Sequence, residues 1–257
     1  MTSEAALRIL MVVEDHADAR TVGTLIDKLL LESEGRPSWI DDGLLPFLRH
    51  WVDLDCAASE APAWRHVTWV EMSKRAPRVL GHGIGGPTRD TYAKAARRAI
   101  QAAQWADSHP NAVVLVVDAD ADRERRAGLA SGRAAQPSAL RVVVGAADPK
   151  REAWVLNAFA PRTDEERARL AELCSSLTFN PCSEAHRLRH KRGELRDIKR
   201  VLDVLTGGDP EREHEALRSA PLQELASAGE ASGLAAFLRE AELVVQLLDG
   251  PPPRPSE

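Results

Sequence analysis

The chain has 257 residues, of which 44% are hydrophobic and 28% charged, and its formal net charge is −5. This composition excludes a disordered chain, and the length allows one large α/β domain or a smaller domain with a helical extension. The negative charge excludes attraction of polyanions over the whole surface, so any nucleic-acid contact would need a local basic patch.

The cysteines and the apolar segments indicate the compartment. Cys56, Cys174 and Cys182 are scattered and match neither a disulfide framework nor a zinc motif, which is typical of a reducing compartment. Glu14 and Asp15 interrupt the apolar run near the N-terminus, and no stretch approaches the roughly 20 apolar residues of a membrane span. We therefore expect a cytoplasmic protein that makes no contact with a membrane.

A strand followed by a helix is expected at the beginning of the chain. Residues 7–13 (LRILMVV) form an apolar run rich in branched side chains, which is typical of a strand buried on both faces. Apolar residues at helical spacing predict a helix over residues 17–31. The next segment, about 32–80, is rich in tryptophan and proline and is interpreted as an insertion with one more strand at 66–70. Its tryptophans are expected in a core or a partner interface rather than stacked on bases.

The middle of the chain continues the alternation of strands and helices. The glycine-rich residues 81–87 (GHGIGGP) lack the Gly-Lys-Ser/Thr ending of a P-loop and are interpreted as a turn or lid. A helix is expected at 88–108, followed by the clearest buried strand of the sequence at 113–117 (VVLVV). A further helix at 123–129 and a strand at 141–145 complete the pattern.

The C-terminal part has mainly helical patterns. Helices are expected at residues 164–177, 196–205, 211–217 and 233–248. We therefore predict an α/β fold with a parallel, Rossmann-like sheet flanked by helices over residues 1–160, including the insertion at 32–80. A largely helical extension over 161–250 is expected to pack onto it, and the proline-rich tail 251–257 is expected to be flexible.

Acidic residues follow two of the predicted strands. They are Glu14 after the first strand, and Asp118, Asp120 and Asp122 after the strand at 113–117. Because the carboxyl ends of parallel strands share one edge of the sheet, these acids are expected to converge. Crowded carboxylates raise one another's pKa and favour a cation, and sites made only of oxygen atoms select Mg²⁺ or Mn²⁺. The sequence therefore predicts a metal site for phosphoryl transfer or phosphodiester hydrolysis.

The same acids have a second interpretation that needs no metal. An acid between a strand and a helix commonly caps the helix, and Asp122 lies where such a cap would fall. Glu14 alone could equally be a cap or a solvent-exposed residue. Glu152 follows the strand expected at 141–145 and is either a further metal ligand or a surface partner of Arg151 or Lys150.

With these acids the chain resembles the TOPRIM superfamily of topoisomerases, primases and OLD-family nucleases, and in particular an uncharacterised bacterial TOPRIM-like group related to OLD-family nucleases and phage defence. The segments that carry the resemblance are VVED at 12–15, VVDAD at 116–120, REAWVL at 151–156, FNP at 179–181 and DIKRVL at 197–202. They cover most of residues 7–205. Many TOPRIM proteins have glycine after the first acid, where this chain has Asp15.

The resemblance implies a TOPRIM-like fold and a Mg²⁺- or Mn²⁺-dependent nuclease of anti-phage defence, acting on DNA or RNA. Glu14, Asp118 and Asp120 would be catalytic, and Lys199 would offset the charge of the transferring phosphate. Lys199 could also belong to an ordinary solvated basic face. The predicted phosphate contacts lie in the basic stretch before it, at Arg187, Arg189, Lys191 and Arg192.

A second hypothesis places the chain in another functional class. Its acidic balance, the missing glycine and the tryptophan-rich insertion also fit a non-catalytic or partner-activated subunit. Such a subunit would form an oligomer or assemble with an ATPase, a partner that the resemblance to defence proteins implies.

Overall fold

The computed structural model describes most of the chain. The described residues are 7–34, 36–38, 40–54, 65–75, 91–120, 122, 124–136, 138–189 and 191–248. The glycine-rich residues 81–87, the tail 251–257 and two tryptophans of the insertion, Trp39 and Trp64, lie outside them. Among the described helices, none combines the length and the apolar character needed to cross a membrane.

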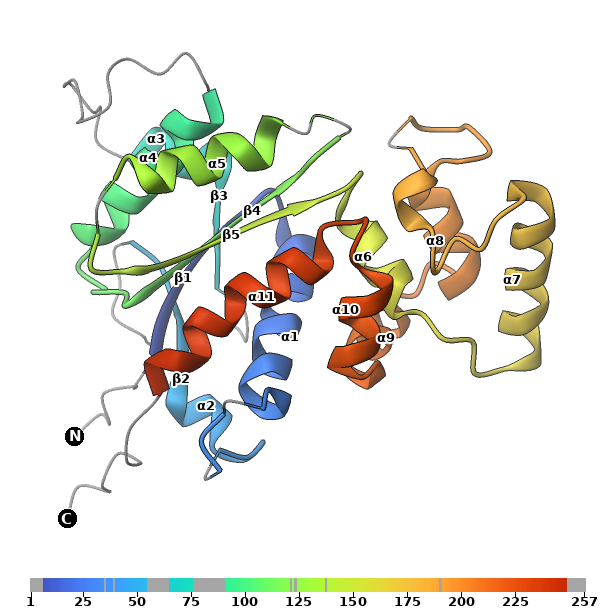
Figure 1. Cartoon of the computed structure of the whole chain (residues 1–257), viewed down its shortest axis with the longest axis horizontal. Coiled ribbons are helices and arrows are strands. Elements are labelled where there is room, and N and C mark those ends of the chain that lie inside the picture. The colour runs from blue at the N-terminus through green and yellow to red at the C-terminus, as the bar shows by residue number, and fades with distance from the viewer. Residues whose placement is uncertain are drawn as a thin grey trace.

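Five parallel strands form the central sheet (Figure 1). They are β1 (Leu7–Val13), β2 (Arg49–Val52), β3 (Val67–Thr68), β4 (Ala112–Asp118) and β5 (Arg141–Ala147). The strand order is β2-β1-β4-β5, and β3 pairs with β1. β2 lies along Leu7–Leu10 and β3 along Val12–Val13, so the two short strands follow each other on one edge of β1. The predicted parallel sheet flanked by helices is confirmed.

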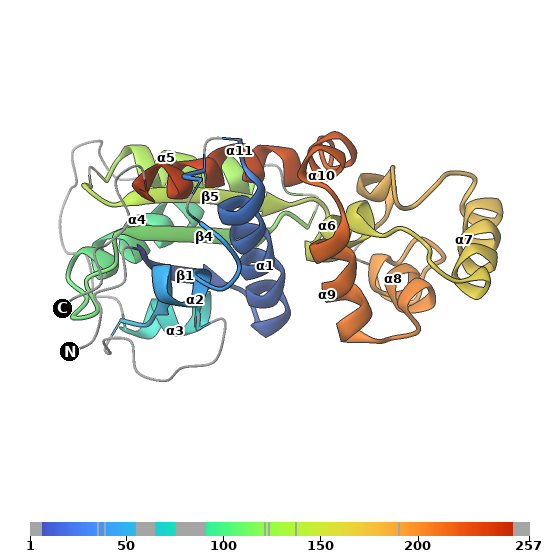
Figure 2. The ribbon, with the colours of Figure 1, turned by 90° about the horizontal axis from the view of Figure 1, so that it is seen from below.

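Helices cover both faces of this sheet (Figures 1 and 2). They are α1 (His16–Glu32), α2 (Leu45–Leu48), α3 (Trp69–Arg75), α4 (Thr91–Gln104), α5 (Glu124–Ala134), α6 (Arg151–Ala158), α7 (Asp164–Leu177), η1 (Ala185–Arg187), α8 (Ile198–Thr206), α9 (Pro210–Ser219), α10 (Leu222–Ala228), α11 (Leu234–Val245) and η2 (Gln246–Leu248). Ile9 and Met11 of β1 face a core shared with α1, α6 and α11, whereas Leu10 and Val12 face a core shared with α3, α4 and α5. This burial on both faces explains the continuous apolar run of β1.

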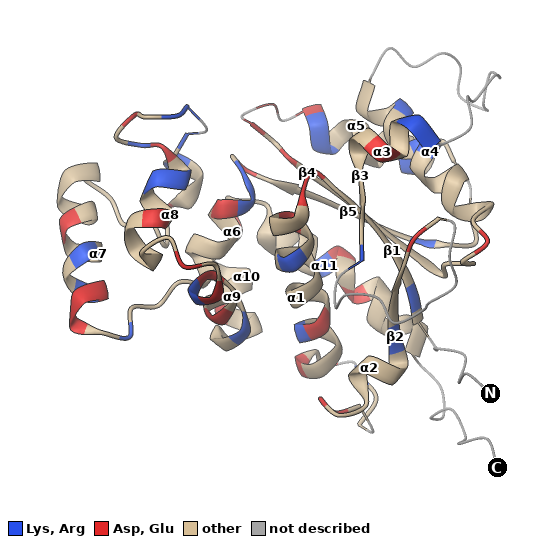
Figure 3. Ribbon diagram, turned by 180° about the vertical axis from the view of Figure 1, so that it is seen from behind, with Lys and Arg blue, Asp and Glu red and all other residues tan. Residues whose placement is uncertain are grey.

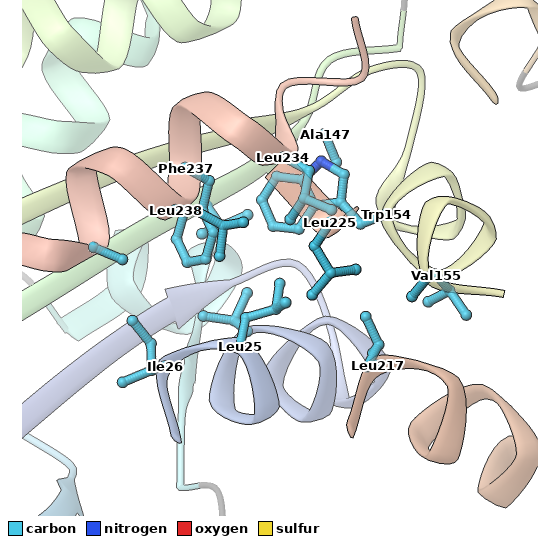
Figure 4. Close-up of a cluster of buried hydrophobic side chains, with 14 of the residues drawn as sticks. Leu25, Ile26, Ala147, Trp154, Val155, Leu217, Leu225, Leu234, Phe237 and Leu238 are labelled. Carbon is cyan, nitrogen blue, oxygen red and sulfur yellow. The ribbon is translucent and has the colours of Figure 1, made fainter. Parts of the chain in front are cut away.

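The last long helix returns to the sheet and completes one of its two cores (Figure 4). Phe237 of α11 stacks on Trp154 of α6 with ring centroids 4.9 Å apart, and both side chains are fully buried. The indole nitrogen of Trp154 donates to the carbonyl oxygen of Ser232 at 2.9 Å, which satisfies its polar group inside the core. α7 and α8 lie at the end of the molecule farthest from α2 and α3 (Figures 1 and 2).

The insertion differs from its expected structure. One strand was expected at 66–70, but β3 contains only Val67–Thr68 and a helix begins at Trp69, while β2 at Arg49–Val52 was not expected at all. β2 consists of two polar residues followed by two apolar ones, so it has no alternating pattern, and its strand conformation depends on pairing with β1. Trp51 of β2 is buried in the core, as expected for a tryptophan of this segment.

Gly233 directly precedes α11 and lies against the backbone of β5, and we predict that replacing it with alanine strongly destabilises the protein. Gly233 has φ +82°, and a Cβ atom there would lie 2.3 Å from the carbonyl oxygen of Ala146. Gly207 is a matched control, since it has φ +70° with no atom near its Cβ position. We expect Gly233→Ala to lower the free energy of unfolding by about 2–3 kcal/mol and Gly207→Ala by about 1 kcal/mol. Urea denaturation measures both, and equal losses would show that the contact with Ala146 is unimportant.

Candidate functional site

The carboxyl ends of β1 and β4 bring two of the predicted acids into contact. The strands are parallel neighbours, with Val12 opposite Leu115, so that both end at the same edge of the sheet. The backbone nitrogen of Asp118 donates to a carboxylate oxygen of Glu14 at 3.2 Å. Glu14 is exposed as a residue, but its carboxylate packs against the end of β4. Desolvation of this carboxylate and the negative charge of Asp118 raise the pKa of Glu14.

Asp118 is the most enclosed acid of the pair. It is 9% exposed, and its Oδ1 atom accepts a hydrogen bond from the backbone nitrogen of Arg151 at 2.9 Å. Its Oδ2 atom accepts from Nζ of Lys150, also at 2.9 Å. Burial raises the pKa of Asp118, although the Lys150 hydrogen bond and charge oppose the shift.

Asp120 turns back towards the same lysine. Its φ is +48°, a left-handed conformation that aspartate tolerates better than most residues, and its backbone nitrogen donates to the carbonyl oxygen of Pro149 at 2.8 Å. Its Oδ1 atom lies 2.9 Å from Nζ of Lys150, and its Oδ2 atom accepts from Nη1 of Arg125 at 2.9 Å. Burial alone would raise the pKa of Asp120, but the contacts with Lys150 and Arg125 outweigh it and lower the pKa.

Lys150 is therefore part of the acidic cluster, a position that the sequence prediction missed. It is the N-cap residue of α6, directly after the carboxyl end of β5, and its ammonium group bridges Asp118 and Asp120. Burial disfavours its charge, but the two carboxylates outweigh burial and hold the Lys150 pKa above its usual value. The position of Lys150 after a strand of the same sheet was visible in the sequence.

Asp18 is a second residue that the prediction missed. Asp15 caps α1 in a reciprocal capping box: its side chain accepts from the backbone nitrogen of Asp18 at 3.0 Å, while Oδ2 of Asp18 accepts from the backbone nitrogen of Asp15 at 3.3 Å. The same Oδ2 atom also accepts from the backbone nitrogen of Glu14 at 3.1 Å. The spacing Asp-x-x-Asp is the sequence signal for this box. Burial, together with the charges of Asp15 and Asp118, raises the pKa of Asp18 to about 7. The capping role after β1 thus belongs to Asp15, and Glu14 is directed to β4.

The other two predicted metal ligands have different surroundings. Asp122 is exposed and accepts from the backbone nitrogen of Glu124 at 3.0 Å, so it caps the beginning of α5. Glu152 is buried at 5% exposure, with its Oε1 atom 3.4 Å from Nη2 of Arg151 and 3.5 Å from Nζ of Lys199. Its Oε2 atom is buried and has no hydrogen-bond partner among the described residues.

Within the part of the chain that the structure describes, two side chains of the predicted basic stretch form ion pairs and two do not. Arg187 pairs with Glu184 at 2.7 Å, and Lys191 pairs with Glu194 at 2.6 Å. Arg192 instead lines an open hollow of about 680 Å³ between the beginning of α6 and α8, as does Lys199. Arg189 is exposed and does not line this hollow.

No protein-family model, curated protein or solved structure matches the chain.

The acidic cluster suits a divalent metal ion by its chemistry, since Glu14, Asp118 and Asp120 supply the oxygen ligands that Mg²⁺ prefers. As they stand, no three acidic, histidine or cysteine side chains in the described parts of the chain form a metal-binding group. Nζ of Lys150 lies 2.9 Å from an oxygen of Asp118 and 2.9 Å from an oxygen of Asp120, where a cation shared by the two carboxylates would lie. The oxygen ligands therefore suit Mg²⁺ by their chemistry, but an ion bound to both Asp118 and Asp120 would have to displace the Lys150 ammonium group.

Proposed function

We propose that the chain is a Mg²⁺- or Mn²⁺-dependent nuclease or related phosphoryl-transfer enzyme of the TOPRIM kind, used in anti-phage defence. The contact between Glu14 and Asp118, at the ends of adjacent parallel strands, is the observation that supports it most. Asp120, two residues later, supplies a third carboxylate. The motifs VVED and VVDAD support the same proposal from the sequence.

In this proposal the three carboxylates, Arg125 and Lys199 have different roles. Glu14, Asp118 and Asp120 would hold the metal ion, which when bound neutralises phosphate oxygens and lowers the pKa of a water molecule. Arg125 orients Asp120 by its hydrogen bond to Oδ2. The side chain of Lys199 is 61% exposed beside Glu152, so it is available to a phosphate arriving from solvent. There it would offset the negative charge that develops during transfer.

Metal binding is the first test of this proposal. We expect wild-type protein to bind Mg²⁺ or Mn²⁺ in calorimetry and the double variant Asp118→Asn/Asp120→Asn to lose this binding. Asp122→Asn is a matched control, since Asp122 lies in the same acidic run but caps α5, and it should keep wild-type affinity.

We expect the wild type and Asp122→Asn to cleave DNA or RNA oligonucleotides and the double variant Asp118→Asn/Asp120→Asn to lose this activity. A folded double variant that still binds metal and cleaves like the wild type would contradict the assignment. Wild-type protein that binds neither ion, with or without an oligonucleotide, would also contradict it.

A second candidate function is a non-catalytic or partner-activated subunit of an assembly with an ATPase. The observation that favours it is the ion-pair network itself, in which Lys150 and Arg125 already neutralise Asp118 and Asp120 without a metal. Such a network stabilises the ends of the strands in a protein with no catalytic activity as well. Native mass spectrometry tests this function: a monomer that forms no complex with a co-expressed ATPase would count against it.

A further inference from the structure

A positively charged hollow lies directly beside the carboxylates. Its volume is about 680 Å³, and it is lined by Lys150, Arg192, Asp197, Lys199, Arg200, Asp203 and Val204. Basic segments of α8 and of the loop before it lie across from the beginning of α6 (Figure 3). Cavities of roughly 300–1,000 Å³ hold whole small molecules, so this hollow has room for more than one phosphate group.

Four basic side chains and two acids, Asp197 and Asp203, line the hollow, so the formal charge of its lining is positive. Asp197 is 5% exposed and is the N-cap of α8, with its oxygens accepting from the backbone nitrogens of Gly193 at 2.8 Å and Lys199 at 3.2 Å. Both oxygens of its carboxylate therefore accept hydrogen bonds from the backbone. Arg192 and Arg200 are exposed, and neither takes part in an ion pair with another described residue. Two guanidinium groups therefore remain available for a ligand, and guanidinium groups match phosphate geometry.

Lys150 connects the hollow with the acidic cluster. The residue lines the hollow, and its ammonium group contacts both Asp118 and Asp120 at 2.9 Å. Lys199 makes a second connection, because it lines the same hollow and lies 3.5 Å from Glu152. An anion held by Arg192 and Arg200 would therefore lie next to the carboxylates that are proposed to act on a phosphodiester.

We propose that this hollow binds consecutive phosphates of a nucleic-acid strand, with Arg192 and Arg200 as the main contacts. The proposal rests on the proposed phosphodiester chemistry, since it names where the strand lies relative to Asp118. It also replaces the expectation for the basic stretch: Arg187 and Lys191 are held by Glu184 and Glu194 and contribute little.

The test is oligonucleotide binding in the presence of EDTA, measured by fluorescence anisotropy with short labelled DNA and RNA strands. Because no metal is present, failure of the metal site and failure of the hollow are distinguishable. Arg192→Ala/Arg200→Ala is compared with Arg187→Ala/Lys191→Ala, which removes the same number of positive charges from the same region. Circular dichroism confirms that each variant is folded.

We expect the variant of the hollow to lose about tenfold or more in affinity and the control variant to lose less than about threefold. Losing two phosphate contacts should also reduce the dependence of log affinity on log salt concentration by about 1.4, since each contact to a single strand contributes about 0.7. Equal losses in both variants would overturn the proposal, because they would show general charge attraction. Wild-type protein that binds neither strand would overturn it as well. Displacement of the strand by equimolar inorganic phosphate would overturn the strand as the occupant and assign the hollow to free phosphate.

Discussion

Lys150→Met is expected to bind Mg²⁺ about tenfold or more tightly than the wild-type protein. A metal ion that binds Asp118 and Asp120 has to displace the Lys150 ammonium group, which lies 2.9 Å from an oxygen of each. A hydrogen bond to a charged group contributes about 1.5–3 kcal/mol, so removing this competitor corresponds to at least about a tenfold change in affinity. Methionine keeps most of the length and apolar character of the side chain without its charge.

Calorimetry on the folded variant measures this effect. Lys199→Met is the matched control: its ammonium group lies 3.5 Å from Glu152 and contacts neither Asp118 nor Asp120, so its metal affinity should stay close to that of the wild type. Weaker Mg²⁺ binding by Lys150→Met would mean that Lys150 supports the arrangement of the carboxylates instead of competing with the ion. Unchanged binding would mean that the metal avoids Asp118 and Asp120.

The sheet was predictable where a strand is buried on both faces. β4 and β5 appear as apolar runs in the sequence and were placed within two residues of their ends, because burial on both faces requires almost every side chain to be apolar. β2 contains Arg49 and His50, so nothing in its four residues distinguishes it from a loop. Its conformation is determined by hydrogen bonds to β1, which a local pattern does not contain.

The site was predictable only in part, for a related reason. Glu14 and Asp118 meet as expected, because neighbouring parallel strands end at the same edge of the sheet. The same argument applied to β5 would have included Lys150, but the prediction considered only acids. For the basic stretch, local pairing was visible as spacing: Glu194 stands three residues after Lys191. The hollow itself depends on the packing of α8 beside α6, which no motif encodes.

A buried ion pair joins α7 and α9 beside the end of α6, the helix whose beginning lines the hollow. Arg212 of α9 and Glu166 of α7 are 9% and 6% exposed, and Nε of Arg212 donates to Oε1 of Glu166 at 2.7 Å. Arg212 also lies over the ring of Phe159 at 4.5 Å and donates to the carbonyl oxygen of Ala160 at 2.7 Å. The hydrogen bond from Arg212 lowers the pKa of Glu166 to about 2, although burial opposes the shift. The pair therefore joins α7 and α9 to the end of α6.

Glu166→Gln is expected to lower the free energy of unfolding at pH 7 by about 3–5 kcal/mol, because it removes the hydrogen-bonded counter-charge of the buried Arg212. Glu172→Gln, an exposed change on the same helix, should stay within about 0.5 kcal/mol of the wild type. The folded-state pKa of Glu166 is depressed from the usual 4.5 to about 2, so the contribution of its charge is complete above pH 4.5 and is lost as the pH falls towards 2. Urea denaturation between pH 7 and pH 2 should therefore show the difference between wild type and Glu166→Gln shrinking across this window. A difference of the same size at both ends would show that shape, and not charge, makes Glu166 important.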